Sequence, residues 1–238
     1  MVVENYRKIA ERVQAACECA GRDPSEVTLI AVSKTKPDEM VRELASIGVR
    51  DFGENKPQEL MRKHDEILPD AEPKLHWHMI GNLQTNKVKQ VVGRAVMIHS
   101  VPSLHLAEAI SKQAEKMDTD VSILIEVNIA DEETKHGASV SEVAELAREI
   151  AKLPRLKIMG LMAIAPFVEN PEDNRENFKN LRCLRDEIKL QLEREGASNA
   201  PMTELSMGMT ADFEVAIEEG ATFVRVGTAI FGERDYSK

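Results

Sequence analysis

Apolar residues along this chain follow two alternating spacings. Short runs such as 27–32 and 121–127 are almost continuously apolar, as is typical of buried strands in a parallel sheet. Between these runs, apolar residues recur every three or four positions, which gives each intervening segment one apolar helical face. The alternation repeats eight times and therefore predicts eight strand–helix units in series.

The boundaries of these elements follow from the ends of each pattern and from glycines such as Gly21, Gly48 and Gly220, which end helices. We expect strands at 27–33, 49–52, 75–80, 95–99, 121–127, 156–162, 204–205 and 222–226. We expect helices at 38–47, 57–68, 85–92, 103–117, 141–152, 172–195 and 212–219, a final turn at 228–232, and one additional helix at 2–20 in front of the first strand.

This order of elements predicts an α/β fold in which the strands pair in parallel. Eight units in about 210 residues fit a single TIM-type (β/α)8 barrel with an extra N-terminal helix, since such barrels usually have about 250 residues. A doubly wound open sheet is the alternative, but its first strand normally leads into a glycine-rich turn, and residues 33–37 contain no glycine. No linker or repeat interrupts the chain, so one domain is expected over residues 1–238.

Composition narrows the classes of function. The chain is 42% hydrophobic and 30% charged, which is typical of a globular protein. A net charge of −10 argues against nucleic-acid and membrane-surface partners, and without a signal pattern or a long apolar run a cytoplasmic location is expected. The three cysteines, Cys17, Cys19 and Cys183, form neither a disulfide framework nor a zinc pattern.

Lys34 is the first candidate for chemistry. It follows the first predicted strand directly, and Pro37 prevents that strand from continuing. In a (β/α)8 barrel the functional site lies at the carboxyl ends of the strands. A lysine there either extends its ammonium into solvent or takes part in amine chemistry.

The loops after the last two predicted strands have the composition of a phosphate site. One contains Ser206, Gly208 and Thr210, and the other contains Gly227 and Thr228. Small residues let backbone N–H groups approach an anion, and hydroxyls add donors. The alternative is that Thr210 only caps a helix and Gly227 only forms a turn.

Arg225 lies within the apolar strand 222–226. A buried guanidinium needs a partner, which would be either a ligand at the mouth of the barrel or a structural ion pair with Glu204 or Glu126. Together with Lys34 and the phosphate loops, Arg225 favours a phosphorylated aldehyde held as a Schiff base. Pyridoxal phosphate is one such ligand, and the substrate of a sugar-phosphate aldolase is another.

Histidines at positions 76 and 78 lie on one face of the third predicted strand, which would suit a pair of metal ligands. No third ligand accompanies them in the sequence, so no metal site is expected.

Five ordered motifs, spread over nearly the whole chain, resemble those of the pyridoxal phosphate homeostasis proteins, which are close to the N-terminal barrel of alanine racemases. The motifs lie at 31–37 (AVSKTKP), 52–59 (FGENKPQE), 77–87 (WHMIGNLQTNK), 204–213 (ELSMGMTADF) and 224–234 (VRVGTAIFGER).

The resemblance implies a role for each matching residue toward pyridoxal phosphate. Lys34 would carry the cofactor as a Schiff base, and Arg225 would face the pyridine nitrogen. Asn55 would lie beside the ring, Met162 would line its far side, and His78 is a further pocket candidate. The phosphate would be held by Ser206, Met207, Gly208, Gly227 and Thr228.

The resemblance also implies what is missing. Alanine racemases need a second domain that supplies a tyrosine base, whereas this chain ends at Lys238 and its tyrosines are Tyr6 and Tyr236. An arginine at the pyridine nitrogen disfavours ring protonation, and with it much amino-acid chemistry. We therefore expect no catalytic residues in a monomer that holds pyridoxal phosphate and passes it transiently to apo-enzymes. A pyridoxal phosphate enzyme, such as an amino-acid racemase, is the alternative.

Overall fold

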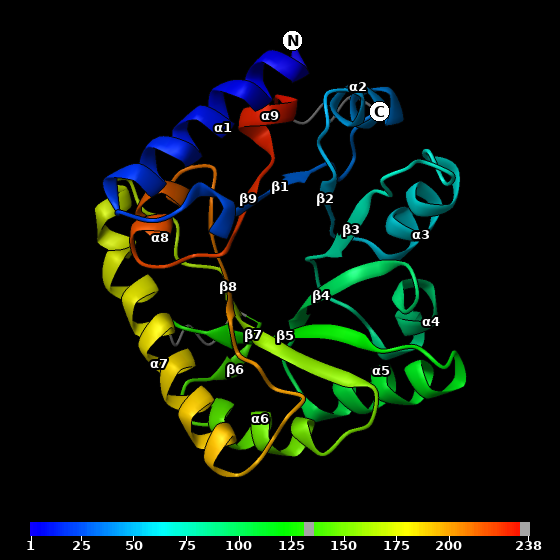
Figure 1. Cartoon of the computed structure of the whole chain (residues 1–238), viewed down its shortest axis with the longest axis vertical. Coiled ribbons are helices and arrows are strands. Elements are labelled where there is room, and N and C mark those ends of the chain that lie inside the picture. Colours follow the sequence, from blue (N-terminus) through cyan, green and yellow to red (C-terminus); the bar gives the residue numbers. More distant parts are fainter. Residues whose placement is uncertain (131–135, 234–238) are drawn as a thin grey trace.

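Eight parallel strands close into a barrel in the computed structural model, which describes residues 1–130 and 136–233 (Figure 1). Tyr236, named above, lies outside the described residues. Each strand pairs with the next, and the last pairs with the first through registers such as Leu29 with Val224. The barrel strands are β1 (Thr28–Val32), β2 (Asp51–Glu54), β3 (His76–Met79), β4 (Ala95–Val101), β5 (Val121–Asn128), β7 (Leu156–Ala163), β8 (Glu204–Met209) and β9 (Phe223–Val226). The predicted (β/α)8 barrel is confirmed.

Helices surround this barrel, and the additional N-terminal helix packs against α8 and α9, as Figure 1 shows. The helices are α1 (Val2–Cys19), α2 (Asp38–Ser46), α3 (Pro57–Glu66), α4 (Val88–Val91), α5 (Leu104–Lys116), α6 (Val143–Ala151), α7 (Arg175–Arg194), α8 (Phe213–Glu218) and α9 (Thr228–Phe231). Short 3-10 turns occur at Pro24–Glu26, Thr85–Lys87 and Pro171–Asn174.

The two faces of the strands bury different side chains. On β1, Leu29 and Ala31 face outward into the main core between the barrel and the helices. Ile30 and Val32 face the barrel interior, where they pack with Ile80. A second interior cluster contains Met97, Leu124 and Met162, with Phe223 packed against both clusters.

Several elements differ from the prediction. The second strand runs over Asp51–Glu54 rather than 49–52, and an unpredicted two-residue strand, β6 (Ala138–Ser139), pairs with β5. The seventh predicted strand continues to Met209, so Ser206, Met207 and Gly208 lie in β8 rather than in a loop. Gly208 has φ +86°, and the pairing with β9 shifts between Ser206 and Met209, so the bulged strand remains paired beyond its glycine.

None of the helices in the described ranges combines the length and the apolar character that crossing a membrane would need.

Candidate functional site

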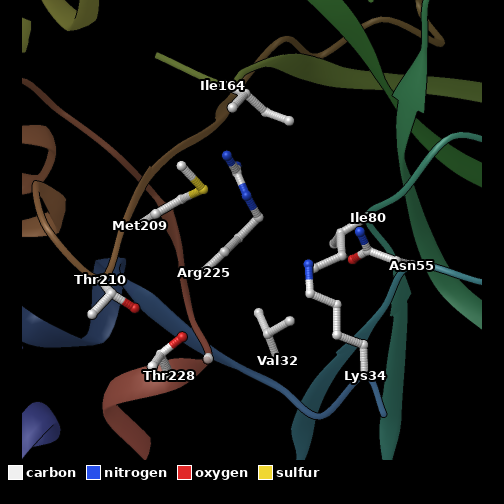
Figure 2. A pocket seen from close by; sticks show the side chains of 10 residues that line it. Val32, Lys34, Asn55, Ile80, Ile164, Met209, Thr210, Arg225 and Thr228 are labelled. Carbon is white, nitrogen blue, oxygen red and sulfur yellow. The ribbon is translucent and has the colours of Figure 1, made fainter. Parts of the chain in front are cut away.

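A cavity of about 170 Å³ opens at the carboxyl ends of the barrel strands (Figure 2). Its size suits part or all of a small molecule rather than a macromolecular segment. Residues at the ends of six strands form its walls, as expected for the site of a (β/α)8 barrel. These residues are Val32, Lys34, Asn55, Ile80, Ile164, Met209, Thr210, Arg225, Gly227 and Thr228.

The side chain of Lys34 extends into this cavity from the segment after β1, as Figure 2 shows. The next residue, Thr35, has φ +63°, a backbone conformation that β-branched residues rarely adopt. Its N–H donates to Glu59 Oε1 at 2.8 Å. The hydrogen bond to α3 therefore holds an unfavourable backbone conformation directly beside the lysine.

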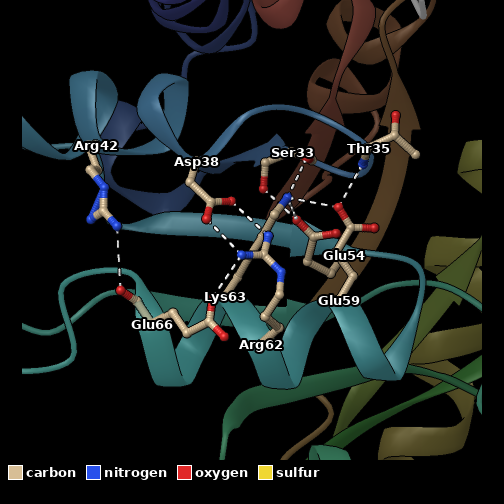
Figure 3. Close-up of polar contacts among 9 residues, drawn as sticks. All are labelled: Ser33, Thr35, Asp38, Arg42, Glu54, Glu59, Arg62, Lys63 and Glu66. Carbon is tan, nitrogen blue, oxygen red and sulfur yellow. Dashed lines mark hydrogen bonds and ion pairs between the residues drawn. The ribbon is translucent and has the colours of Figure 1, made fainter. Parts of the chain in front are cut away.

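A buried polar cluster supports the other side of Lys34 (Figure 3). Lys63 on α3 is fully buried, and its Nζ donates to Ser33 O and to Glu54 Oε1, both at 2.7 Å. The Ser33 hydroxyl donates to the same carboxylate oxygen at 2.6 Å, and Lys63 also pairs with Glu59 at 3.0 Å. We call Ser33, Glu54, Glu59 and Lys63 the clamp, because it fixes the backbone on both sides of Lys34.

The carboxyl group of Glu54 has an unusual environment. Burial raises its pKa, and the Lys63 ammonium and the hydrogen bonds from Lys63 and Ser33 reverse that effect only in part. Its second oxygen, Oε2, is buried and makes no hydrogen bond with any described residue. The clamp therefore depends on contact between opposite charges that are both withdrawn from water.

Arg225 reaches the same cavity from β9, and its side chain lies between Lys34 and Ile164 in Figure 2. Its guanidinium is buried and donates from Nη1 to Ser206 Oγ at 2.6 Å and from Nη2 to the Ala163 carbonyl at 2.9 Å. Burial lowers its pKa to about 10, although the charges of Asp212 and Glu126 act in the opposite direction.

The proposed structural ion pair of Arg225 is not formed. Over the described residues, neither Glu204 nor Glu126 comes within ion-pair distance of its guanidinium, although the charge of Glu126 still acts on it. Its partners are a hydroxyl and a carbonyl, both neutral, so Arg225 carries a buried charge next to the cavity.

Thr210 and Thr228 place their hydroxyls on the side of the cavity away from Lys34 (Figure 2). Gly227 lies beside them at the end of β9, where α9 begins. The Asp212 carboxylate accepts from the Met209 N–H at 2.7 Å and so fixes the turn that presents Thr210. Hydroxyls and a small residue close to a helix start are suited to an anionic group.

Asn55 lines the cavity opposite these hydroxyls, and its Oδ1 is buried with no hydrogen-bond partner among the described residues. Gly81 makes this position of Asn55 possible, because a Cβ at Gly81 would lie 2.4 Å from the Asn55 carbonyl oxygen. A buried amide oxygen without a partner at a cavity wall is a natural contact for a ligand.

Of the ten residues to which the family resemblance assigns a role, five line the cavity, namely Lys34, Asn55, Arg225, Gly227 and Thr228. The other five do not. Met162 belongs to the interior apolar cluster, and Met207 faces the main core outside the barrel. Gly208 packs against α8, where an added Cβ would lie 2.6 Å from Ala216 Cβ.

Ser206 and His78 also lie away from the cavity lining, and both are buried inside the barrel. Ser206 binds Arg225, and His78 Nδ1 lies 3.0 Å from His99 Nε2. A direct contact of these five residues with a phosphate or a ring stays a prediction.

Sequence patterns did not indicate some of the residues that line the cavity or support Lys34. The apolar lining at Val32, Ile80, Ile164 and Met209 was not singled out, because these residues resemble ordinary core positions. Lys63 could have been found, since it lies three residues after Leu60 and four before Ile67, on the buried face of its helix.

A search of the described residues finds no group of three or more histidine, cysteine or acidic side chains placed to hold a metal ion.

Comparison with known proteins gives consistent matches. The family model "Alanine racemase, N-terminal domain" matches residues 5–235. A curated relative from Aquifex aeolicus, named pyridoxal phosphate homeostasis protein, is 48% identical over 233 residues, which is 98% of each chain.

Solved structures agree with these matches. A protein from Bifidobacterium adolescentis, described only as unknown, has a TM-score of 0.88 and 35% identity, covering 97% of this chain and 94% of that one. PipY of Synechococcus elongatus, in a structure with PLP bound, has a TM-score of 0.79 and 35% identity, covering 94% of this chain and 100% of PipY.

Proposed function

The chain belongs to the family of pyridoxal phosphate homeostasis proteins, which carry the alanine racemase N-terminal domain, and from this premise we propose that it binds pyridoxal phosphate in the cavity at Lys34. The role that fits this site is to hold the cofactor reversibly inside the cell and pass it on. Bound pyridoxal phosphate supplies an aldehyde, which condenses with the Lys34 amine and releases water.

One arrangement supports this proposal above all others. The Lys34 amine and the hydroxyls of Thr210 and Thr228 lie on opposite sides of one small cavity, and the Arg225 guanidinium lies on a third side, toward Ile164. Pyridoxal phosphate carries its aldehyde and its phosphate arm on neighbouring ring carbons and its ring nitrogen opposite the aldehyde, so these three groups would meet Lys34, the hydroxyls and Arg225. The unpartnered Oδ1 of Asn55 and the buried charge of Arg225 then face the ring between them.

The roles of the neighbouring residues follow from whether they line the cavity or contact a residue that does. Gly227 and Thr228 bind the phosphate, and Thr210 joins them from the neighbouring loop. Ser206 acts on the cofactor through Arg225, to which it is hydrogen bonded. Met207 and Gly208 shape the bulge that leads to Thr210.

The curated relatives carry the name of a homeostasis protein and not that of an enzyme, which supports binding and transfer over racemisation. Over the described residues, Tyr6 is the sole tyrosine; it lies on α1 and does not line the cavity. The proposed setting is a cytoplasmic monomer that meets apo-enzymes transiently.

A test of the covalent site uses absorbance and borohydride. The purified protein mixed with pyridoxal phosphate should turn yellow, lose that colour on borohydride reduction, and retain the label on the peptide that contains Lys34. Lys34→Ala should remove the label. Lys36→Ala is the matched control, because Lys36 Nζ donates to Gly232 O and Glu233 O instead of lining the cavity. A label that persists in Lys34→Ala would contradict the proposal.

A second measurement separates binding from catalysis. The loaded protein is incubated with alanine in heavy water, and exchange of the α-proton is followed by NMR. No exchange at enzyme-like rates is expected. Sustained exchange that disappears in Lys34→Ala would establish a racemase-type activity in place of simple binding.

A further inference from the structure

A continuous chain of hydrogen bonds crosses the interior of the barrel behind the cavity. It begins at Arg225, passes through Ser206, His99 and His78, and ends at Asp51. The successive distances are 2.6 Å from Arg225 Nη1 to Ser206 Oγ, 2.9 Å from Ser206 Oγ to His99 Nδ1, 3.0 Å from His99 Nε2 to His78 Nδ1, and 3.1 Å from His78 Nε2 to Asp51 Oδ1. We call these five residues the relay.

The relay joins the two ends of the barrel. Arg225 lines the cavity at the carboxyl ends of the strands. Asp51 is the first residue of β2, at the opposite end of the barrel, where its side chain is 28% exposed. The exposed His76 also lies at that end, and its Nδ1 is 3.0 Å from the same Asp51 oxygen. Neither Asp51 nor His78 touches the cavity.

Donor and acceptor roles along the relay follow from its two ends. An ionised carboxylate can only accept, so a neutral His78 carries its proton on Nε2, donates it to Asp51 and accepts at Nδ1. By the same logic His99 donates from Nε2 to His78 and accepts at Nδ1. The Ser206 hydroxyl therefore donates to His99, and it accepts from the guanidinium of Arg225, which can only donate. Every hydrogen bond therefore points from Arg225 toward Asp51.

The surroundings of the two histidines keep them neutral. Both rings are buried, and Phe223 packs against them with ring centroids 5.7 Å from His78 and 5.3 Å from His99. Burial lowers the pKa of His78, and it lowers that of His99 further, with the neighbouring His78 ring and the charge of Arg225 acting in the same direction. Asp51 partly opposes the shift of His78.

Asp51 is suited to its place at the end of the chain. Burial by itself would raise its pKa, but its contacts with His78 and with His76 together leave the pKa lowered. The charge of Asp51 also raises the pKa of Tyr6 of α1, after the larger effect of burial. Asp51 is thus a carboxylate at neutral pH and a fixed acceptor for the relay.

We propose that Asp51, His78 and His99 are positioning residues that act on the cofactor through Ser206, by keeping its hydroxyl turned away from Arg225 so that the guanidinium stays fixed toward the cavity. This proposal deepens the proposed function and rests on it, because the group that Arg225 faces is the ring of bound pyridoxal phosphate.

The relay itself can be tested without any cofactor. Long-range ¹H–¹⁵N NMR of the unliganded protein, labelled at its six histidines, reports the protonated nitrogen of each ring. We expect two rings that are neutral and protonated on Nε2 at pH 7, assigned by their loss in His78→Gln and His99→Gln. A ring protonated on Nδ1, or charged at pH 7, at either position would overturn the direction of the relay.

The effect on the cofactor is tested with Asp51→Asn, which conserves size and removes the charge. The dissociation constant for pyridoxal phosphate and the pH dependence of its visible band should both change, with about 3- to 10-fold weaker binding, the equivalent of one hydrogen bond. Asp65→Asn is the matched control. Asp65 also contacts a histidine, at 2.8 Å from His64 Nδ1, and Arg94, but it has no connection to the relay.

A double-variant cycle decides whether the coupling passes through Ser206. If it does, Asp51→Asn should weaken binding in the native background and have almost no effect in a Ser206→Ala background. Additive effects would overturn the proposal and support direct binding of phosphate by Ser206. If the native protein does not bind pyridoxal phosphate at all, the proposed function fails, whereas the NMR result still decides whether the relay exists.

Discussion

The clamp and the relay are both buried polar clusters, and each supports one cationic side chain at the cavity, but they do so by different means. The clamp lies outside the barrel wall, where α3 brings the Lys63 ammonium into contact with Glu54 and Glu59. The relay lies inside the barrel, where Arg225 meets only neutral groups and its carboxylate is three hydrogen-bonding groups away.

This difference reflects what each location allows. Between strand and helix, two long side chains can approach until their charges touch, and the resulting pair fixes the backbone around Lys34. Inside the barrel, space is limited to interleaved layers of side chains. A neutral chain there supports Arg225 without a direct counter-charge, which leaves the positive charge of the guanidinium available to a ligand.

The largest expected effect is at the clamp. Lys63→Met leaves Glu54 buried without its partner and should lower the free energy of unfolding by about 3–5 kcal/mol. Urea denaturation measures this loss. The control is Lys112→Met on the exposed face of α5. An equal, small loss of stability in both variants would mean that Lys63 contributes no more to stability than an exposed lysine does.

Arg225→Met tests the relay. It should weaken binding of pyridoxal phosphate far more than it lowers the stability of the fold. The variant removes a charge that has no contacting counter-charge, so its unfolding midpoint should stay close to the native value. Retention of pyridoxal phosphate in equilibrium dialysis should fall at least about tenfold, because charge-assisted hydrogen bonds to the ligand are lost. Arg7→Met, at an exposed position of α1, is the control. If Arg225→Met unfolded the protein instead of weakening binding, Arg225 would stabilise the fold as Lys63 of the clamp does, and the proposed difference between the two clusters would be wrong.

Lowering the pH should lower the part of the free energy of unfolding that His99 contributes, because the relay holds His99 neutral. Near pH 6.5 His99 takes up a proton in the unfolded chain but stays neutral in the folded protein, where its pKa is lowered. This contribution to stability is complete above pH 6.5 and is lost as the pH falls. Between pH 6.5 and 5.5 the stability difference between native protein and His99→Gln should shrink by up to about 1 kcal/mol.

The native protein is compared with a variant because the raised pKa values of Glu54 and Glu126 change the stability with the opposite sign as the pH falls. Thermal unfolding at several pH values gives the measurement, and His105→Gln, at an exposed position, is the control. A constant difference between native protein and His99→Gln would show that His99 is not held neutral.

A similarly small effect is expected at the edge of the clamp. Glu59→Gln weakens the hydrogen bond to the Thr35 N–H and one contact of Lys63, and should cost about 0.5–1.5 kcal/mol of stability. The rate at which Lys34 is labelled by pyridoxal phosphate and borohydride should also fall, since its backbone is less fixed. Glu108→Gln on α5 provides the comparison. Unchanged labelling would mean that Glu59 does not help to orient Lys34.

Much of this protein follows from local sequence. The alternating apolar spacings predict the eight strand–helix units, because strand and helix periods depend only on neighbouring residues. Lys34, Asn55, Gly227 and Thr228 could be placed at the cavity because each follows a strand, and the carboxyl ends of parallel strands meet at one end of a barrel. The motifs added the family and its cofactor.

Tertiary structure decided the rest. Ser206 resembles a loop hydroxyl in the sequence, yet the bulge at Gly208 keeps it inside β8 and joins it to Arg225. Asp51 and Lys63 carry no motif, because their partners lie on other elements and are brought close only when the barrel closes. The sequence determined which residues stand at the mouth of the barrel, and only packing decided which buried charges and hydrogen bonds hold them there.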